Sequence, residues 1–102
     1  MKIYNKLVRD KIPEVIEKSG KKCEAEVVSK EEHYIRLKEK LKEEVDEFLE
    51  AENIEELADI YEVIAALASF VGKGEVELME VREKKREERG GFSEGVVLRA
   101  IE

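Results

Sequence analysis

The sequence lacks the features that mark a secreted or membrane-spanning protein. Cys23 is the only cysteine in 102 residues, so an intramolecular disulfide is excluded and a reducing compartment is favoured. There is no apolar run of about 18 residues, the shortest stretch that spans a bilayer, and no signal peptide is visible. We therefore expect a cytoplasmic protein with no membrane partner.

Thr, Gln and Trp are absent, and the chain has a single Pro. Because 42% of the residues are hydrophobic, disorder is excluded even though 44% are charged. Abundant Glu, Lys and Arg with few amide side chains is typical of hyperthermophile proteins, which predicts a thermophilic source. The length suits one domain over residues 1–102, and a domain this small gains stability when it forms an oligomer.

A basic face is also missing. The net charge is −7, and the two signs are mixed along most of the chain. A protein that binds a nucleic-acid polymer needs a basic surface to displace phosphate counterions, so we expect no such partner. A small polyanionic substrate would have to be held by a few cations or by a metal ion.

Apolar spacing and capping residues predict an all-α protein of about four helices. Pro13 suits the first turn of a short helix that ends at Ser19-Gly20. Ser29 and Glu32 form a capping-box pattern, in which each side chain binds a free backbone N–H of the other residue. The helix that they start should run to about residue 51, and a further helix is expected over residues 75–89.

The remaining helix is predicted over residues 54–71, with Asn53 as its N-cap. Thirteen of its eighteen residues are apolar, so it should be buried on several sides. Either the centre of a bundle or contact with a second subunit would bury it. The loop before it is only about four residues long, so it should form an antiparallel hairpin with the preceding helix.

The two ends of the chain are expected to be short extended arms. Residues 23–29 alternate loosely and suit either an extended arm or a short strand. Val96 to Leu98 is also prone to form a strand, and these two segments are candidates to pair with each other.

Four acidic residues do not fit a simple solvated surface. A helical wheel places Glu44 beside the apolar face of its helix, with Glu47 three residues further along the same flank. On the next helix Glu56 falls inside the apolar arc, and Asp59 borders it. A bare carboxylate on a mostly buried helix costs several kcal/mol, by order of magnitude, unless it is paired or binds a cation.

In an antiparallel hairpin the two acidic pairs lie at the same end, next to the connection. Four converging carboxylates make an all-oxygen site, which suits Mg²⁺ or Mn²⁺ and not zinc, because no His or Cys accompanies them. The competing interpretation is that each acid is paired with a Lys or an Arg. Spacing and predicted burial alone do not separate the two.

The same acids carry a resemblance to a known family. E-E-x-x-E followed by E-x-x-D, here Glu43-Glu44-Val45-Asp46-Glu47 and Glu56-Leu57-Ala58-Asp59, resembles the signature of MazG-like, all-α nucleoside-triphosphate pyrophosphohydrolases. The opening YNKLVRDKIPEVIEKSG and the ending KKREERGGF resemble a subgroup described as phosphoribosyl-ATP pyrophosphohydrolase-like. Only eight residues separate Glu47 from Glu56, so the helix–loop–helix is tighter than is usual in MazG-type members.

The resemblance implies an enzyme that cleaves between the α and β phosphates, releasing a nucleoside monophosphate and pyrophosphate. By the same resemblance Glu44, Glu47, Glu56 and Asp59 are ligands of one or more Mg²⁺ ions. Glu47 or Glu44 is the candidate catalytic base that takes a proton from the attacking water.

Cations that flank the acids are the candidates for phosphate contacts. They are Lys6 and Arg9 near the start of the chain, and Lys85 and Arg89, whose i, i+4 spacing places them on one helical face. Ordinary surface ion pairing is an equally good explanation for each. Asn5 is a candidate base contact or a turn residue, with the turn slightly favoured, and Phe92 is the best candidate to stack on a base.

Two further functions stay open at this point. Phosphoribosyl-ATP hydrolysis in histidine biosynthesis uses the same metal chemistry on a different substrate. A non-catalytic helical interaction module belongs to another class, in which the helix over residues 54–71 is a dimer seam and the four acids tolerate substitution. In each case a homodimer or a dimer of dimers is expected, since two hairpins can bury their long helices as a four-helix bundle.

Overall fold

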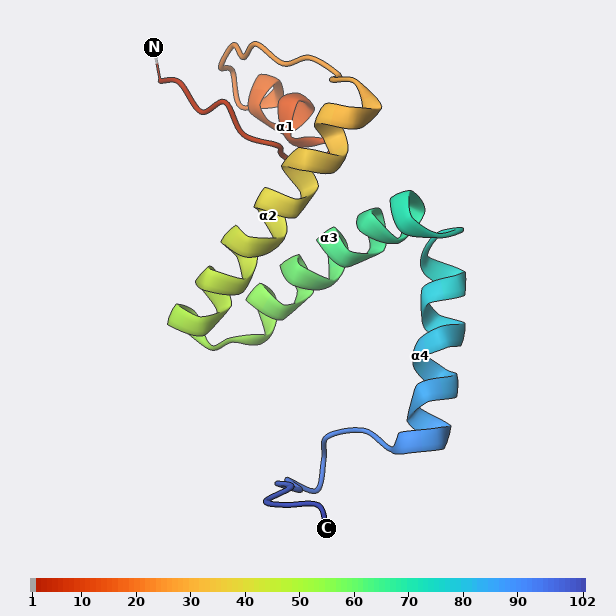
Figure 1. The fold of residues 1–102 in the computed structure, drawn as a ribbon. Coiled ribbons are helices and arrows are strands. Elements are labelled where there is room, and N and C mark those ends of the chain that lie inside the picture. The colour runs from red at the N-terminus through yellow and green to blue at the C-terminus, as the bar shows by residue number, and fades with distance from the viewer. Residues whose placement is uncertain (1) are drawn as a thin grey trace.

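The computed structural model describes residues 2–102, and over that range the chain is entirely helical apart from loops and arms (Figure 1). The helices are α1 (Ile12–Lys18), α2 (Lys30–Ala51), α3 (Ile54–Val71) and α4 (Glu75–Arg89). The predicted all-α class with about four helices is confirmed. None of the helices formed by residues 2–102 combines the length and the apolar character needed to cross a bilayer.

The helix ends follow the chemistry of their capping residues. Pro13 occupies the first turn of α1, the Ser29 hydroxyl accepts the Glu32 N–H, and Asn53 Oδ1 accepts the Glu56 N–H at 3.0 Å. Only half of the predicted capping box forms, because the Glu32 carboxylate accepts a hydrogen bond from Arg36 Nε at 2.8 Å. A guanidinium one helical turn away competes successfully with the backbone donor for that carboxylate.

Helices α2 and α3 form the predicted antiparallel hairpin (Figure 1). Their connection is shorter than expected, since only Glu52 and Asn53 separate them. Glu52 takes a left-handed conformation with φ 50°, and its N–H donates to the Phe48 carbonyl at 2.7 Å. This tight turn places the last turns of α2 directly opposite the first turns of α3.

The core lies between α2 and α3 and is small. Leu37, Val63 and Ala68 are the buried apolar residues of the described range. At the end of the hairpin far from the turn, the Phe70 ring stacks on Tyr34 at 5.3 Å and meets His33 edge-on at 5.1 Å between ring centroids. Aromatic pairs of this kind contribute about 0.5–1.5 kcal/mol beyond the area that they bury.

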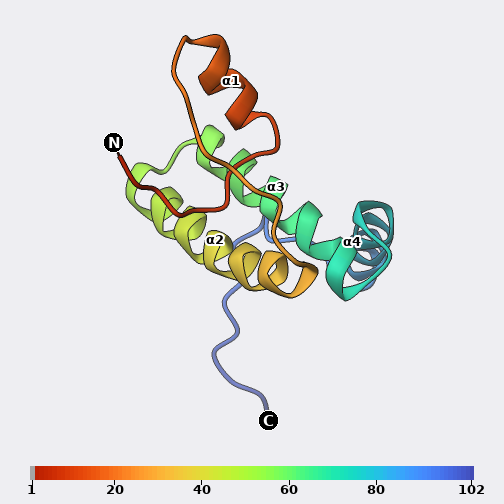
Figure 2. The same cartoon turned by 90° about the horizontal axis from the view of Figure 1, so that it is seen from above.

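The N-terminal segment crosses the hairpin and is tied to both of its helices (Figure 2). The Arg36 guanidinium on α2 donates to the Asn5 carbonyl at 3.1 Å and to Asn5 Oδ1 at 3.2 Å. Asn5 has φ 44°, a left-handed conformation that asparagine tolerates better than most residues.

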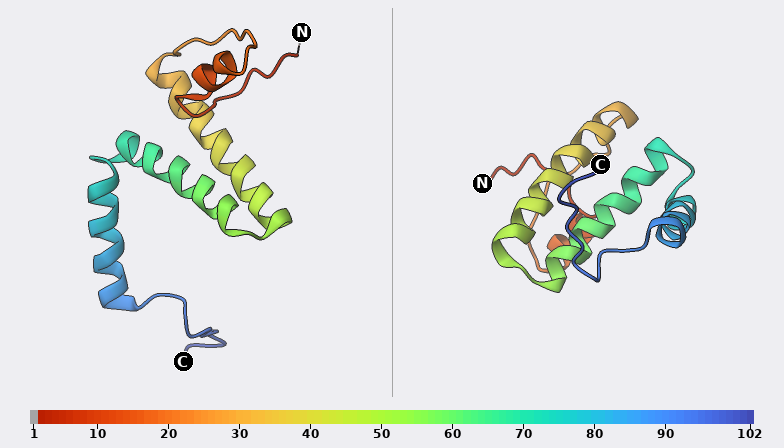
Figure 3. Two further views of the ribbon diagram at one scale, coloured as in Figure 1. Left: turned by 180° about the vertical axis from the view of Figure 1, so that it is seen from behind. Right: turned by 60° about the horizontal axis from the view of Figure 1, so that its bottom comes forward.

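Helix α4 leaves the hairpin at a sharp bend (Figure 3). The Glu77 carboxylate accepts the Lys73 N–H at 3.0 Å, and a side chain at position 72 would displace that carboxylate. Helix α4 packs against α3 and makes no contact with α2. Residues 91–102 follow as an arm that forms no hydrogen bond or ion pair within the described chain.

One sequence prediction needs correction. The proposed pairing of residues 24–28 with Val96–Leu98 does not occur, because the described chain contains no strand. Helix α4 carries the second segment away, so both remain extended arms. Within the single chain, helix α3 is packed by α2 on one side and by the start of α4, and Ile54, Leu57 and Tyr61 are exposed, so the predicted burial of α3 on several sides would require a second subunit.

Candidate metal centre

The turn end of the hairpin brings the predicted acids together. Glu44 and Glu47 lie in the last two turns of α2, and Glu56 and Asp59 lie in the first two turns of α3. Carboxylate oxygens of Glu44, Glu56 and Asp59 all lie within 4.8 Å of one another. Two consecutive helices joined by two residues thus place three carboxylates around one point.

A second group of carboxylates shares Glu44 with the first. Oxygens of Glu43, Glu44 and Glu47 also lie within 4.8 Å of one another. Glu47 is exposed and belongs to this group alone, so the four predicted ligands do not surround a single point. Glu43 also pairs with Lys6 at 3.3 Å and with Lys40 at 3.6 Å.

Glu44 is the buried member of both groups. Its side chain keeps only 9% of its surface exposed, and its Oε1 lies 3.4 Å from Lys40 Nζ. Its Oε2 is buried and receives no hydrogen bond from any group in residues 2–102. Glu56 Oε2 is also buried and receives no hydrogen bond from these residues. A buried oxygen that receives no hydrogen bond lowers the stability of the fold by about 1–3 kcal/mol, and by more when it is charged. Each of these two oxygens could therefore accept a positive partner.

The surroundings of Glu44 change its proton affinity. Burial raises the pKa of the Glu44 carboxyl, and the neighbouring Glu47 carboxylate raises this pKa further, whereas Lys40 acts in the opposite direction. The net effect is a raised pKa. The site therefore disfavours the negative charge that the sequence places there, and a cation bound between the carboxylates would relieve that cost.

Three cations already approach the acids. Arg9 Nη2 lies 2.7 Å from Asp59 Oδ1, Lys6 binds Glu43, and Lys40 lies between Glu43 and Glu44. The two groups contain five carboxylates in all, so the three cations leave two negative charges uncompensated. The ion-pair interpretation thus accounts for Glu43, Glu44 and Asp59 and leaves Glu47 and Glu56 without an ion pair among residues 2–102.

Lys40 and Arg36 were not among the residues predicted from sequence. Lys40 stands three and four residues before Glu43 and Glu44 on α2, a spacing that places a lysine over both acids. That signal was present in the sequence. Arg36 donates hydrogen bonds to Asn5 and Glu32. No local sequence pattern predicts its contact with Asn5, which is 31 residues away in the chain.

A small cavity adjoins the carboxylates on the α2 side. It has a volume of about 190 Å³, and its lining includes Lys6, Arg36 and Lys40 with Glu39 and Glu43. The predicted phosphate contact Lys6 therefore lies beside the acids. Arg9 reaches the same region from the other side through Asp59.

The two remaining predicted cations are elsewhere in the chain. Lys85 and Arg89 lie on the second half of α4, which points away from the hairpin (Figure 3). Phe92 follows α4 in the C-terminal arm and is fully exposed. A single chain brings Asn5, Lys6 and Arg9 to the acids and does not bring Lys85, Arg89 or Phe92.

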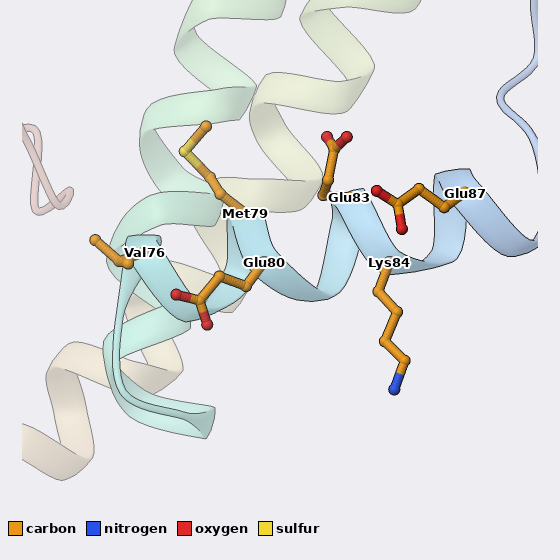
Figure 4. Close-up of a pocket in the computed structure, with 6 residues that line it drawn as sticks. All are labelled: Val76, Met79, Glu80, Glu83, Lys84 and Glu87. Carbon is orange, nitrogen blue, oxygen red and sulfur yellow. The ribbon is translucent and has the colours of Figure 1, made fainter.

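A larger surface hollow is remote from this chemistry. It is a shallow groove on α4 lined by Val76, Met79, Glu80, Glu83, Lys84 and Glu87 (Figure 4). All six of these residues belong to one helix (Figure 4). The acid cluster is therefore the better candidate functional site, although it is not the larger hollow.

Comparison with protein-family models, curated proteins and solved structures finds no match.

Proposed function

We propose that the chain is a Mg²⁺-dependent nucleoside-triphosphate pyrophosphohydrolase that releases a nucleoside monophosphate and pyrophosphate. One observation carries the metal part of this proposal. Glu44 Oε2 is buried without a hydrogen-bond donor in a cluster where Glu56 Oε2 is also buried and unsatisfied. The resemblance of the acidic motif, the opening and the ending to MazG-like enzymes supplies the reaction.

The donor set fits magnesium. All the candidate ligands are carboxylate oxygens, with no imidazole or thiolate among them, and hard oxygen donors are those that Mg²⁺ prefers. Glu44, Glu56 and Asp59 would hold the ion, with Glu47 next to them on the solvent side. When bound, Mg²⁺ supplies charge neutralisation and orientation of the phosphates for in-line attack.

The protein's own groups have separate parts in the reaction. Glu47 is exposed and adjacent to Glu44, which suits it to take the proton from the attacking water. Burial and the neighbouring Glu47 carboxylate raise the pKa of Glu44, and a bound cation would oppose both by favouring the ionised carboxylate. Lys6 and Lys40 line the neighbouring cavity, where they would bind phosphate oxygens.

The test is a panel of nucleoside triphosphates, deoxynucleoside triphosphates and phosphoribosyl-ATP, incubated with Mg²⁺ at high temperature and analysed by product. Monophosphate and pyrophosphate are expected, and Glu56→Gln should lower turnover by at least about 100-fold, since loss of metal-site groups has effects of this size or larger. Glu55→Gln is the matched control, because Glu55 is the exposed neighbour on the same turn.

Metal binding is tested separately from turnover. A ligand at about 100 times its Kd stabilises the folded state by about 2.7 kcal/mol, which raises Tm by roughly 10–20 °C for a domain of this size. This shift should be lost in Glu56→Gln and kept in Glu55→Gln. Orthophosphate as the product would contradict the cleavage position. Absence of both turnover and a Mg²⁺ shift would contradict the enzyme and favour the interaction module.

A further inference from the structure

The N-terminal segment, residues 2–9, lies across the hairpin and is held there mainly by polar side chains (Figure 2). Among residues 2–102, no backbone–backbone hydrogen bond joins residues 2–8 to α2 or α3. Every residue of the segment except Leu7 is exposed, so apolar packing contributes little. Three polar anchors join the segment to the hairpin: Lys6 with Glu43 at 3.3 Å, Arg9 with Asp59 at 2.7 Å, and Asn5 with Arg36 at 3.1 Å.

The anchor at Asn5 differs from the other two in its geometry. Arg36 Nη1 donates to the Asn5 carbonyl at 3.1 Å, and Arg36 Nη2 donates to Asn5 Oδ1 at 3.2 Å. Two hydrogen bonds from one planar guanidinium fix the orientation of the acceptor residue as well as its position. Arg36 is also the least exposed of the three cations, at 27% of its side-chain surface against 56% for both Lys6 and Arg9. Water therefore competes least for the bonds that Arg36 makes.

Arg36 is itself held in place on α2. Its Nε donates to Glu32 Oε2 at 2.8 Å, an i, i+4 contact within the helix. The guanidinium is planar, so the bond at Nε sets the plane in which both Nη groups lie. The donors that Asn5 receives are therefore oriented by the helix and not by the segment that they hold.

The bonds from Arg36 act on a residue with an uncommon backbone conformation. Asn5 has φ 44°, and a left-handed conformation at a residue other than glycine persists where surrounding contacts favour it. Lys6 comes next in the chain and reaches Glu43, which lies seven residues after Arg36 on the same face of α2. The cavity of about 190 Å³ has Asn5, Lys6 and Leu7 on the side of the segment. A change at Asn5 would thus move Lys6 and one wall of this cavity.

Of the three anchors, the one made by Arg36 does not involve the candidate metal ligands. The other two use Glu43 and Asp59, which belong to the carboxylate groups that could hold a metal ion. A bound cation would compete for these carboxylates with Lys6 and Arg9 and would leave both side chains free to bind phosphate oxygens. The acceptors of Arg36 belong to neither group, so its contacts would remain.

We propose that Arg36 is a positioning residue, which acts through Asn5 to fix the N-terminal segment over the hairpin. Lys6 and Arg9 then stay beside the acids, where they bind the phosphates of the substrate. The inference rests on the proposed function, which supplies the substrate, but the order that Arg36 gives to the segment can be measured without turnover. Arg36 itself is assigned no contact with the substrate.

The first measurement is backbone ¹⁵N relaxation of residues 3–9, with and without Mg²⁺. The wild type should give order parameters of about 0.85, typical of a rigid backbone, whereas Arg36→Gln should lower them below about 0.6. Lys38→Gln is the matched control, because it removes the same charge from α2 about 200° round the helix, where Lys38 lies over the Tyr34 ring. Its order parameters should equal those of the wild type. Unchanged signals from α2 and α3 in all three proteins would show that the fold is intact.

Steady-state kinetics with a nucleoside triphosphate that the wild type hydrolyses separates positioning from stability. Arg36→Gln should raise KM at least about 10-fold with little change in kcat, since hydrogen bonds between charged groups contribute this much to binding. A purely structural role would lower the fraction of folded enzyme, and hence kcat, at an unchanged KM. Asn5→Ala should raise KM by a similar factor, and the double variant should show no further rise, because both substitutions remove the same contact.

Order parameters that stay at the wild-type level in Arg36→Gln would overturn the proposal. A lower kcat at an unchanged KM would also overturn it. KM effects of Arg36→Gln and Asn5→Ala that multiply in the double variant would make Arg36 a direct ligand of the substrate and not a positioning residue. Absence of turnover by the wild type on every nucleotide would contradict the proposed function, and with it the role of Arg36 in substrate binding. The order parameters would still decide whether Arg36 holds the segment.

Discussion

The α2–α3 hairpin and the region formed by α4 and the C-terminal arm differ in how they use their charged and apolar residues. In the hairpin, charges from three segments of the chain meet at one end, and Glu44 is buried among them. In α4 and the arm, no residue is buried. The hairpin thus contains a site that one chain can build, whereas the other region has surfaces that one chain cannot cover.

The difference teaches that amphipathic character alone does not tell where a helix is packed. Helix α4 and the outer face of α3 have apolar residues at helical spacing, yet these residues are exposed. What distinguishes the hairpin is a two-residue turn that forces its helices together. The effect of a substitution on Tm should therefore depend on metal concentration in the hairpin and on protein concentration in the arm.

The largest difference is expected between Leu37→Ala and Leu98→Ala. Leu37 is buried between α2 and α3, so its truncation should cost about 2–5 kcal/mol and lower Tm by roughly 10 °C or more at every protein concentration. Leu98 is exposed in the arm, so its truncation should lower Tm only where the protein is associated. Thermal unfolding at two concentrations that differ 100-fold checks this, and equal losses at both would contradict it.

Glu44→Gln should stabilise the metal-free protein by about 1 kcal/mol at neutral pH, because it removes a buried charge whose second oxygen has no donor. The pKa of Glu44 is raised by folding, so the folded state binds its proton more tightly than the unfolded state does. The contribution of Glu44 to stability is therefore present at low pH and is lost as the pH rises through this pKa.

The measurement is Tm against pH in EDTA for the wild type and for Glu44→Gln. As the pH rises from below the ordinary pKa range of glutamate, the Tm of the wild type should decrease relative to the Tm of the variant. The difference between the two Tm values should then become constant at higher pH. Adding Mg²⁺ should reverse the order, because only the wild type has the ligand. A variant that is less stable in EDTA at neutral pH would show that Lys40 already compensates the charge.

Asn53→Ala should cost about 1 kcal/mol, since it removes the Asn53 Oδ1 that accepts the Glu56 N–H at the start of α3. The expected loss in Tm is about 4–8 °C. An unchanged Tm in Asn53→Ala would mean that the α2–α3 packing alone sets the start of α3.

Arg9→Ala should have the smallest effect on stability, at most about 1 kcal/mol, because its ion pair with Asp59 is between half-exposed side chains. If the proposed function is right, KM for the nucleotide should rise by a larger factor than this small loss of stability would produce. Steady-state kinetics beside thermal unfolding separates the two effects, with Lys18→Ala as the control, since Lys18 pairs only with Glu14 on α1.

Much of the hairpin was predictable because its signals are local. The spacing of apolar residues and the caps at Ser29 and Asn53 predict the bounds of α2 and α3 to within a residue of those observed. The convergence of Glu44, Glu56 and Asp59 follows from a short turn and the helical repeat. The grouping of Glu47 with Glu43 was not predicted, because helix spacing does not say how two helices are rotated about their axes.

The sequence by itself determined the helices, their order, the antiparallel hairpin and the end of it at which the acids gather, since each depends on interactions between residues close in the chain. Only the tertiary structure decided which cations reach those acids, because the pairs Arg9–Asp59 and Lys6–Glu43 join residues 50 and 37 positions apart. It also decided that α4 leaves the hairpin, because α4 packs against α3 and makes no contact with α2, an arrangement that the apolar pattern within neither helix specifies.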